Sequence, residues 1–298
     1  MSEVAPANAK ALVGESELGR AVDEVARCTA LVPLQGNLFE ITFRSAEVAR
    51  RARPGEFAQV EVDSGQIPLL RRPFSFSRAD PEAGTVAFYL GAVGVGSRRL
   101  RGFAPGDQAR LLGPLGRGFT LPARPGRSAL VSGGLGAAPF PLLADRLREI
   151  GEQMIWLNGA RNSAELYPDD LIPPGISEVV QFTEDGSRGR RGLVTAGLRP
   201  LLSDLDRIYV CGPNSMLAAV VSLIDESPSD RADRPRVEVS IEAPMGCGFG
   251  TCLGCAIPLR PPTAARDPVI GLCCRQGPVM QDSMLDWARL RTQPAHLE

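Results

Sequence analysis

Residues 247–255 read C-G-F-G-T-C-L-G-C and set three cysteines at the spacing C-x4-C-x2-C. The three are Cys247, Cys252 and Cys255, and a fourth follows in the pair Cys273-Cys274. This spacing, with a distant fourth cysteine, is typical of a plant-type [2Fe–2S] cluster bound by four thiolates. Glycine at positions 246, 248, 250 and 254 lets the backbone turn tightly and direct N–H groups at the sulfur atoms. The stretch therefore predicts an iron–sulfur site.

A zinc site and a disulfide pair are the two alternatives for the same cysteines. Zinc sites with four cysteines usually combine two C-x2-C knuckles, and the second knuckle is missing here. Five of the seven cysteines fall within residues 247–274. That concentration favours a metal site in a reducing compartment over a disulfide framework, so we expect a cytoplasmic protein.

The composition excludes several classes of function. A chain of 298 residues with 44% apolar and 22% charged residues is expected to form two or three packed domains. Its net charge of -1 gives no electrostatic reason to bind nucleic acid or an anionic membrane. It has neither a long apolar run nor a secretory signal, so no membrane span is expected. Its single histidine is His296, which argues against a Ser–His–Asp triad, a Cys–His pair or a His-ligated zinc.

The first part of the chain has the pattern of a small antiparallel β-barrel. A loose tail over residues 1–22, with a short helix expected at 7–13, precedes short strands separated by glycine and proline. The expected strands are residues 24–31, 38–45, 57–62, 86–90 and 108–112, and G-P-L-G-R-G-F at 113–119 is expected to close the barrel as a turn. Frequent short strands with little helix indicate a barrel over residues 23–122.

Two features of this barrel are suited to phosphate binding. In R-R-P-F-S at residues 71–75, Arg72 can form a fork onto a phosphate, although such an arginine is also common as a plain surface charge. The sequence G-V-G-S at 94–97 reads as a turn into a helix start, where free N–H groups favour an anion. Neither pattern is specific by itself.

After Pro122 the pattern changes to alternating strands and helices, which predicts a parallel α/β sheet over residues 123–232. A strand at 128–132 runs into G-G-L-G-A-A-P at 133–139 and a helix at 140–150, an arrangement that lets a pyrophosphate approach the helix start. Further strands are expected at 154–158, 179–183 and 208–211, the last ending in C-G-P at 211–213. Two interpretations of Cys211 remain open: a small buried apolar residue, or a residue that contacts the nicotinamide.

The remaining residues, 233–298, are expected to form a small cluster domain with a C-terminal tail. A polar linker at 225–235 and a strand at 236–241 lead into the cysteine stretch. Residues 258–268 are expected to be an irregular loop, and a short helix is expected around Trp287. The predicted fold is therefore multidomain β plus α/β: an antiparallel β-barrel, for which the resemblance described next implies FAD binding, a parallel-sheet nucleotide-binding domain and a small C-terminal [2Fe–2S] domain.

The order of these features resembles the ferredoxin–NADP reductase superfamily and, within it, the electron-transfer subunits of class 1B dihydroorotate dehydrogenase, the PyrK family. The resemblance covers about residues 23–285. Its most specific parts are R-R-P-F-S at 71–75, G-P-L-G-R-G-F at 113–119, T-E-D-G-S at 183–187, C-G-P-N-S-M-L at 211–217 and the cysteine set.

The resemblance implies a set of cofactor-binding residues. For FAD these are Arg72, Pro73, Phe74, Ser75, Tyr89, Leu90, Gly91, Gly96 and Ser97, and for NAD they are Gly133, Gly134, Gly136, Cys211, Gly212 and Pro213. The implied cluster ligands are Cys247, Cys252, Cys255 and Cys274, with Cys274 preferred because it precedes R-Q-G-P at the family's offset. Two departures are Gly91, where the family usually has arginine, and the adjacent Cys273, which leaves the fourth ligand open to exchange.

The resemblance also implies a function. Members of the family relay electrons from a partner subunit, which carries FMN and oxidises dihydroorotate to orotate, through a [2Fe–2S] cluster and FAD to NAD+. No side chain of this chain is expected to act as an acid or base, and a two-plus-two assembly with the partner is expected. The alternative is a subunit that feeds electrons from NAD(P)H to a ferredoxin, an oxygenase or a hydrogenase. Arginines at 161, 188, 190 and 191 leave the choice between NAD and NADP open.

Overall fold

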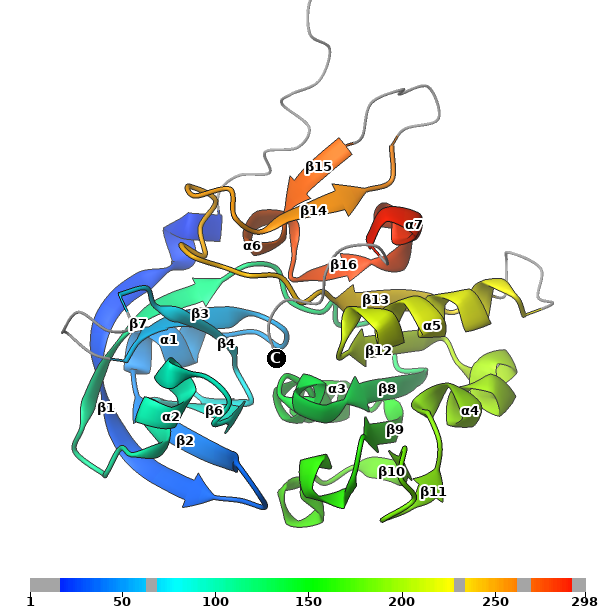
Figure 1. Cartoon of the computed structure of the whole chain (residues 1–298), viewed down its shortest axis with the longest axis horizontal. Coiled ribbons are helices and arrows are strands. Elements are labelled where there is room, and N and C mark those ends of the chain that lie inside the picture. Colours follow the sequence, from blue (N-terminus) through cyan, green and yellow to red (C-terminus); the bar gives the residue numbers. More distant parts are fainter. Residues whose placement is uncertain (1–16, 63–68, 228–233, 262–268, 291–298) are drawn as a thin grey trace, which may run out of the picture.

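The computed structural model describes residues 17–62, 69–227, 234–261 and 269–290, and places two large sheets side by side with a smaller unit above them (Figure 1). The short helix expected at residues 7–13 lies outside the described residues. Within the described ranges, no helix has the length and apolar character that a membrane span requires.

The first sheet is antiparallel throughout. Its strands are β1 (Val22–Pro33), β2 (Leu38–Arg44), β3 (Phe57–Glu61), β4 (Arg72–Ser75), β5 (Arg78–Asp80), β6 (Thr85–Gly91) and β7 (Gln108–Leu115), in the order β4-β3-β7-β1-β2-β6-β5. Helices η2 (Glu17–Arg20), α1 (Ala46–Arg51) and α2 (Val95–Arg101) accompany it. Alternate strand residues such as Ala58, Val60 and Phe88 fill its apolar core.

This sheet curls so that its two edges approach each other. The N–H of Phe76 donates to the Glu56 carbonyl next to β3, and the N–H of Ser77 donates to the Ala87 carbonyl in β6. The expected antiparallel barrel is confirmed as a curled sheet, with strands close to the expected ranges. The expected turn at 113–119 is wrong in part, because β7 continues through Leu115.

The second sheet is parallel except at one edge. Its strands are β8 (Arg127–Gly133), β9 (Gln153–Ala160), β10 (Ile176–Thr183), β11 (Arg190–Arg191), β12 (Arg207–Cys211), β13 (Arg236–Ser240) and β16 (Val279–Gln281), in the order β11-β10-β9-β8-β12-β13-β16. Only β16 runs antiparallel, against β13. Its helices are η3 (Gly134–Ala137), α3 (Phe140–Ile150), η4 (Ser163–Glu165), η5 (Asp169–Leu171), α4 (Val194–Leu198), η6 (Arg199–Asp204) and α5 (Asn214–Asp225).

Both faces of this sheet are buried, as a parallel sheet requires. Leu130 packs on the α3 side, whereas Val131 packs on the side of α4 and α5. The helix expected at 140–150 has those bounds, and Gly151 ends it in the left-handed conformation at φ 83°. The predicted α/β sheet is confirmed.

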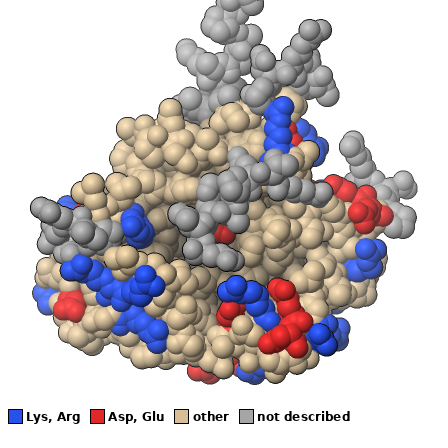
Figure 2. Space-filling model, viewed as in Figure 1, with Lys and Arg blue, Asp and Glu red and all other residues tan. Residues whose placement is uncertain are grey.

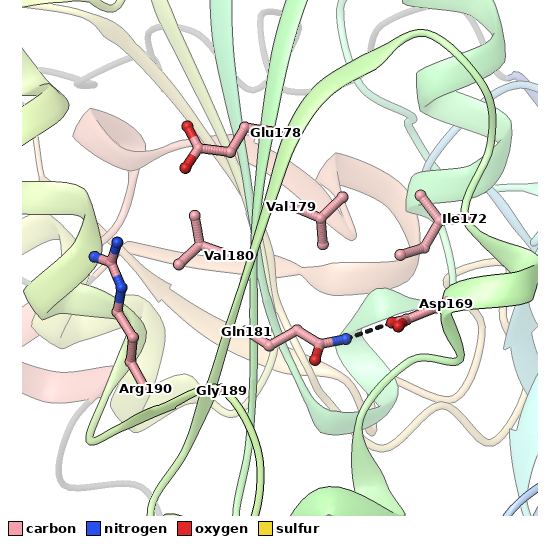
Figure 3. A pocket seen from close by; sticks show the side chains of 8 residues that line it. All are labelled: Asp169, Ile172, Glu178, Val179, Val180, Gln181, Gly189 and Arg190. Atoms are coloured by element: carbon pink, nitrogen blue, oxygen red, sulfur yellow. Dashed lines mark hydrogen bonds between the residues drawn. The ribbon is translucent and has the colours of Figure 1, made fainter.

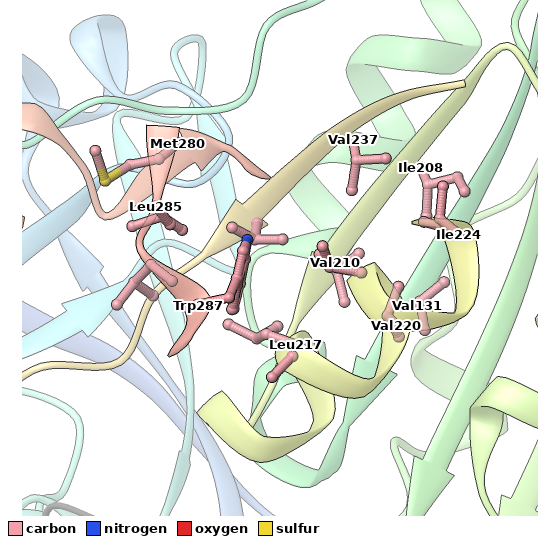
Figure 4. Close-up of a cluster of buried hydrophobic side chains, with 14 of the residues drawn as sticks. Val131, Ile208, Val210, Leu217, Val220, Ile224, Val237, Met280, Leu285 and Trp287 are labelled. Atoms are coloured by element: carbon pink, nitrogen blue, oxygen red, sulfur yellow. The ribbon is translucent and has the colours of Figure 1, made fainter. Parts of the chain in front are cut away.

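The C-terminal unit contains a hairpin and shares its core with the second sheet. It comprises β14 (Ala256–Leu259), β15 (Val269–Leu272), α6 (Cys273–Gln276), η7 (Asp282–Met284) and α7 (Trp287–Leu290). Trp287 and Leu285 belong to the same buried cluster as Leu217 of α5 (Figure 4). The helix expected at Trp287 is therefore present.

Two expectations about this unit need adjustment. Residues 258 and 259 belong to β14, so the irregular loop expected at 258–268 is wrong at its start, because these residues pair with β15. In addition, β13 and β16 lie within 233–298 but belong to the second sheet. The sheet therefore crosses the expected domain boundary.

Candidate functional site

The cysteine stretch is a tight loop that starts beyond the carboxyl end of β13. Gly248 and Gly250 have φ values of 82° and 90°, and Leu253 has a φ of 59°, which is unusual for a residue with a side chain. The Cys252 N–H donates to Cys247 Sγ at 3.5 Å. The first two cysteines thus form a local pair, in which Cys247 is half-buried and Cys252 is exposed.

The β14–β15 hairpin brings the fourth cysteine to the third. Cys255 directly precedes β14, and Cys274 follows β15 within two residues; the register pairs Ala256 with Leu272. The Cys255 and Cys274 sulfur atoms lie 3.2 Å apart, and both are buried. Cys273 Sγ instead lies 3.6 Å from the Ile241 carbonyl oxygen. Only one cysteine of the 273–274 pair therefore faces Cys255.

Backbone N–H groups favour thiolates in this loop. Partial burial acts to raise the pKa of the Cys247 thiol, but hydrogen bonds from the N–H groups of Cys252, Phe249 and Thr251 outweigh it and lower that pKa to about 7. The hydrogen bond from the Cys274 thiol, against the opposing effect of burial, lowers the pKa of Cys255 to about 6. Burial raises the pKa of Cys273 well above its usual range, which keeps that thiol neutral.

The four sulfur atoms fit a cluster with two metal ions. They stand in two pairs, 247 with 252 and 255 with 274, and two irons need two thiolates each. N–H groups of residues 252, 254 and 274 point at these sulfur atoms, which suits an iron–sulfur cluster. The donor set therefore fits [2Fe–2S] better than zinc.

The segment predicted to bind flavin, Arg72 to Ser75, is the edge strand β4. A Cβ placed on Gly96 would lie 3.0 Å from Arg72 Cγ, so the arginine lies against the first turn of α2. Within that turn, the Gly94 N–H donates to Ser97 Oγ at 3.1 Å. Basic side chains gather over this part of the barrel, where α2 contributes Arg98, Arg99 and Arg101 (Figure 2). The two sequence features predicted to bind phosphate therefore lie next to each other.

The second segment predicted to bind flavin, Tyr89 to Gly91 in β6, contacts residues of the second sheet's connections. The Tyr89 ring packs on Tyr167 with 4.8 Å between centroids, and its hydroxyl has no hydrogen-bond partner among the described residues. Leu90 is buried in the barrel core, so its backbone alone is available to a ligand. A Cβ on Gly91 would lie 3.2 Å from Leu135 Cδ1. The end of β6 therefore meets the glycine loop of η3.

The residues predicted to bind NAD lie together at the carboxyl ends of β8 and β12. A Cβ on Gly136 would lie 2.2 Å from the Cys211 carbonyl oxygen, and one on Gly133 would lie 2.6 Å from Met216 Sδ. Gly134 and Gly212 have φ values of 54° and 158°. These glycines allow two loops to pack backbone to backbone at the carboxyl ends of the strands, the edge at which parallel α/β sheets bind ligands.

Cys211 ends β12 and lies in the second of these two loops, two residues before Pro213. Burial raises the pKa of its thiol to about 12, against a smaller opposing effect of the hydrogen bond with Ser240. The thiol is therefore neutral at pH 7 and presents a small, weakly polar surface.

A cavity of about 410 Å³ lies elsewhere, along the outer edge of the second sheet (Figure 3). Its lining comes from β10, β11 and η5 and includes Gln181, whose amide donates to Asp169 at 2.5 Å. None of the predicted site residues lines this cavity. The loops of the two sheets meet instead at the strand ends, where Gly91 of β6 approaches Leu135 and Gly136 approaches Cys211.

Two further features near the cysteine loop could not be predicted from the sequence. Gln59 of β3 is fully buried, and its amide donates to the Met245 carbonyl at 3.0 Å, two residues before Cys247. Leu69, Leu70 and Leu253 are exposed by 82%, 55% and 63%. A single glutamine in an apolar strand is a weak signal, and local sequence does not show which leucines reach the surface.

Comparison with protein families identifies the cysteine region. Residues 242–286 match the model of the iron–sulfur cluster binding domain of dihydroorotate dehydrogenase B. The matched range includes all four predicted ligands.

Two curated relatives resemble nearly the whole chain. A protein of Desulforamulus reducens, named dihydroorotate dehydrogenase B (NAD(+)), electron transfer subunit, is 34% identical over 264 residues, 88% of this chain and 97% of the relative. The protein of the same name from Geobacillus thermodenitrificans is 35% identical over 246 residues, 82% of this chain and 90% of the relative.

Solved structures share the fold. The structure of an NADH-dependent reduced ferredoxin–NADP oxidoreductase, described for flavin-based electron bifurcation, superposes with a TM-score of 0.76 at 24% identity, over 90% of this chain and 92% of the other. The ferredoxin NADP+ reductase of Neisseria gonorrhoeae, with bound FAD and NADP, gives a TM-score of 0.60 at 16% identity, over 74% and 99%. The arrangement of a curled β-sheet beside an α/β sheet is therefore that of the ferredoxin reductases.

Proposed function

This chain belongs to the family of electron transfer subunits of dihydroorotate dehydrogenase B, and from that premise we propose how it works. It relays electrons between a catalytic partner subunit, which oxidises dihydroorotate to orotate, and NAD+. The chain binds a [2Fe–2S] cluster and FAD for this purpose. The observation that carries the proposal is the meeting of four cysteines, three from a loop and Cys274 from the end of a hairpin, where that loop contacts the strand next to the flavin segment.

FAD supplies the conversion between a hydride, exchanged with nicotinamide as an electron pair, and single electrons, exchanged with the cluster. The protein's own residues bind, orient and shield these groups. No residue of the site needs to act as an acid or base, which agrees with the single histidine of the chain, His296.

The cluster ligands are Cys247, Cys252, Cys255 and Cys274. Their backbone surroundings favour the thiolate form of Cys247 and Cys255. Cys273 is not a ligand in this proposal, because its sulfur atom lies against the Ile241 carbonyl.

FAD binds along β4 and the first turn of α2. Arg72, Gly96 and Ser97 hold its phosphates, and Pro73, Phe74 and Ser75 lie along the ring, with Tyr89, Leu90 and Gly91 on the second strand. Arg98 and Arg99, which extend from the same short helix, supply the charge that the family's arginine would give at position 91.

NAD+ binds at Gly133, Gly134, Gly136, Cys211, Gly212 and Pro213. The nearby arginines support NAD over NADP, because two of them are paired with carboxylates. Arg161 Nε lies 3.0 Å from Glu165 Oε2, and Arg188 Nη2 lies 2.5 Å from Asp169 Oδ2. Guanidinium groups already neutralised by carboxylates have less to offer a 2′-phosphate.

The partner subunit carries FMN and docks over the exposed cysteine. A Cβ on Gly246 would lie 3.8 Å from Leu70 Cδ1 and 3.5 Å from Cys252 Sγ, so Leu70, Gly246, Cys252 and Leu253 form one surface. Exposed leucines beside a cluster ligand suit a surface that a second protein covers. Two copies of each subunit form the assembly, in the cytoplasm, which agrees with the absence of a disulfide among the seven cysteines, all of which lie in the described residues.

Co-expression with an FMN-containing dihydroorotate dehydrogenase catalytic subunit tests this function. The complex is expected to reduce NAD+ with dihydroorotate, and the isolated chain is expected to hold flavin and iron without oxidising dihydroorotate. Chromatography with light scattering measures the two-plus-two assembly. Dihydroorotate oxidation by the chain alone would contradict the relay, and transfer from NADH to a ferredoxin, with no effect of the catalytic subunit, would favour the alternative acceptor.

A further inference from the structure

Gln59 occupies a position between the two proposed redox sites. It lies in the middle of β3, where Ala58 and Val60 point into the barrel core and Phe57 packs into the core of the second sheet. Side chains alternate along a strand, so Gln59 shares the outward face of Phe57. It is nevertheless fully buried, because the cysteine loop covers it.

The loop is shaped around this glutamine on both sides of Cys247. Gln59 Nε2 donates to the Met245 carbonyl at 3.0 Å. On the other side, a Cβ placed on Gly248 would lie 2.6 Å from Gln59 Cγ and 2.8 Å from Nε2. One side chain from the barrel thus contacts residues on both sides of a proposed cluster ligand.

The same strand position connects to the flavin segment. Gln59 is paired with Pro73 of β4 in the antiparallel register, so their side chains lie on the same face of the sheet. β3 therefore carries Gln59 beside the proposed flavin strand and beneath the cysteine loop.

The other half of the Gln59 amide is unsatisfied. Its Oε1 is buried and has no hydrogen-bond partner among the described residues. A buried amide oxygen without a partner is costly, so a donor is expected. Exchanging the two amide atoms gives no solution, because oxygen would then face the Met245 carbonyl. Thiolates and sulfide are acceptors, so the cluster cannot supply the donor either.

We propose that Gln59 is a positioning residue that couples the flavin to the cluster. Its N–H group holds the cysteine loop at Cys247, and its free oxygen accepts a hydrogen bond from an N–H group of the flavin or from a water bound with it. This role rests on the proposed function. Loss of the Gln59 amide is expected to slow electron transfer from flavin to cluster without slowing the reduction of flavin by NADH.

The experiment compares Gln59→Leu and Gln59→Glu with matched changes at Gln108, an exposed glutamine at the start of β7. The full chain, loaded with both cofactors, is mixed anaerobically with NADH. Flavin reduction is followed by absorbance and cluster reduction by freeze-quenched EPR. A redox titration gives the cluster potential. Gln59→Leu is expected to slow cluster reduction by about 10- to 100-fold, the range typical of groups around metal ligands. Gln59→Glu is expected to lower the cluster potential, because it adds negative charge beside Cys247.

Wild-type rates and potentials in a loaded Gln59→Leu protein would overturn the proposal. If Gln59→Leu does not fold or does not bind both cofactors, Gln59→Asn provides the test instead. This variant keeps the amide group but shortens the side chain that carries it. Slower cluster reduction in loaded Gln59→Asn supports the proposal, and wild-type behaviour overturns it. Failure of the proposed function looks different, because the wild-type chain would then show no cluster reduction by NADH at all.

Discussion

The two halves of the cysteine site are built in different ways. Cys247 and Cys252 are five residues apart in one glycine-rich loop, and Cys252 is exposed. Cys255 and Cys274 are nineteen residues apart, meet through a hairpin and are buried. The difference indicates a division of roles: the hairpin pair anchors the cluster in the protein, and the loop pair faces the barrel at Gln59 and the proposed docking surface at Leu253.

The largest effect is expected from removing a ligand of the exposed pair. Cys252→Ser should abolish the cluster absorbance and iron content, leave FAD bound, and reduce electron transfer from the partner to NAD+ by at least about 100-fold, since loss of a ligand exceeds the usual effect of its neighbours. Absorbance spectra and NAD+ reduction by the complex measure this. Cys28→Ala, a buried thiol in the barrel core, is the control and should keep the cluster. Transfer at the normal rate in Cys252→Ser would refute the relay.

Separate substitutions of Cys273 and Cys274, the adjacent cysteines after β15, test which of the two is the cluster ligand paired with Cys255. Cys274→Ala should remove iron and sulfide, because its sulfur atom lies 3.2 Å from Cys255 Sγ. Cys273→Ala should keep both and cost about 1 kcal/mol of unfolding free energy, a typical value for a single buried substitution. Metal analysis and thermal unfolding provide the measurements. Retained iron in Cys274→Ala together with loss in Cys273→Ala would reverse the ligand assignment.

A substitution at Gly248 tests whether the loop with Cys247 and Cys252 needs its close contact with Gln59 of the barrel. Gly248→Ala places a Cβ 2.6 Å from Gln59 Cγ at a φ of 82°, so it should destabilise the loaded protein by about 1–3 kcal/mol and reduce its iron content. Gly254→Ala is the matched control, because its Cβ would meet only Cys252 Sγ, at 3.6 Å. Equal stability of the two variants in thermal unfolding would show that the contact with Gln59 does not constrain the loop.

The smallest effect is expected at Leu253. Leu253→Gly removes a side chain at a φ of 59°, so the isolated subunit should keep its stability or gain up to about 1 kcal/mol. Its affinity for the partner should fall, because an exposed leucine is lost from the docking surface. Calorimetric titration with the partner and thermal unfolding of the subunit separate these two effects. Unchanged affinity would place the partner elsewhere.

The sequence could predict what is encoded locally. The spacing of the first three cysteines, the glycine loop after β8 and the amphipathic helix α3 are all readable within a few residues. Contacts between distant segments could not be predicted. Gln59 and Met245 are 186 residues apart, and the pairing of β16 with β13 depends on the whole sheet. The direction in which Cys273 and Cys274 point also depends on tertiary packing, because adjacent residues of the same type carry no local signal.

The most direct test of the central claim is an absorbance spectrum of the anaerobically purified chain, with iron and acid-labile sulfide assays on the same sample. If the chain is an electron relay, the spectrum will show flavin bands with a broad shoulder at longer wavelength, and the assays will give about two irons and two sulfides per chain. Flavin without iron, or one zinc without sulfide, would contradict it and make the cysteine loop a structural element of a simple flavin reductase.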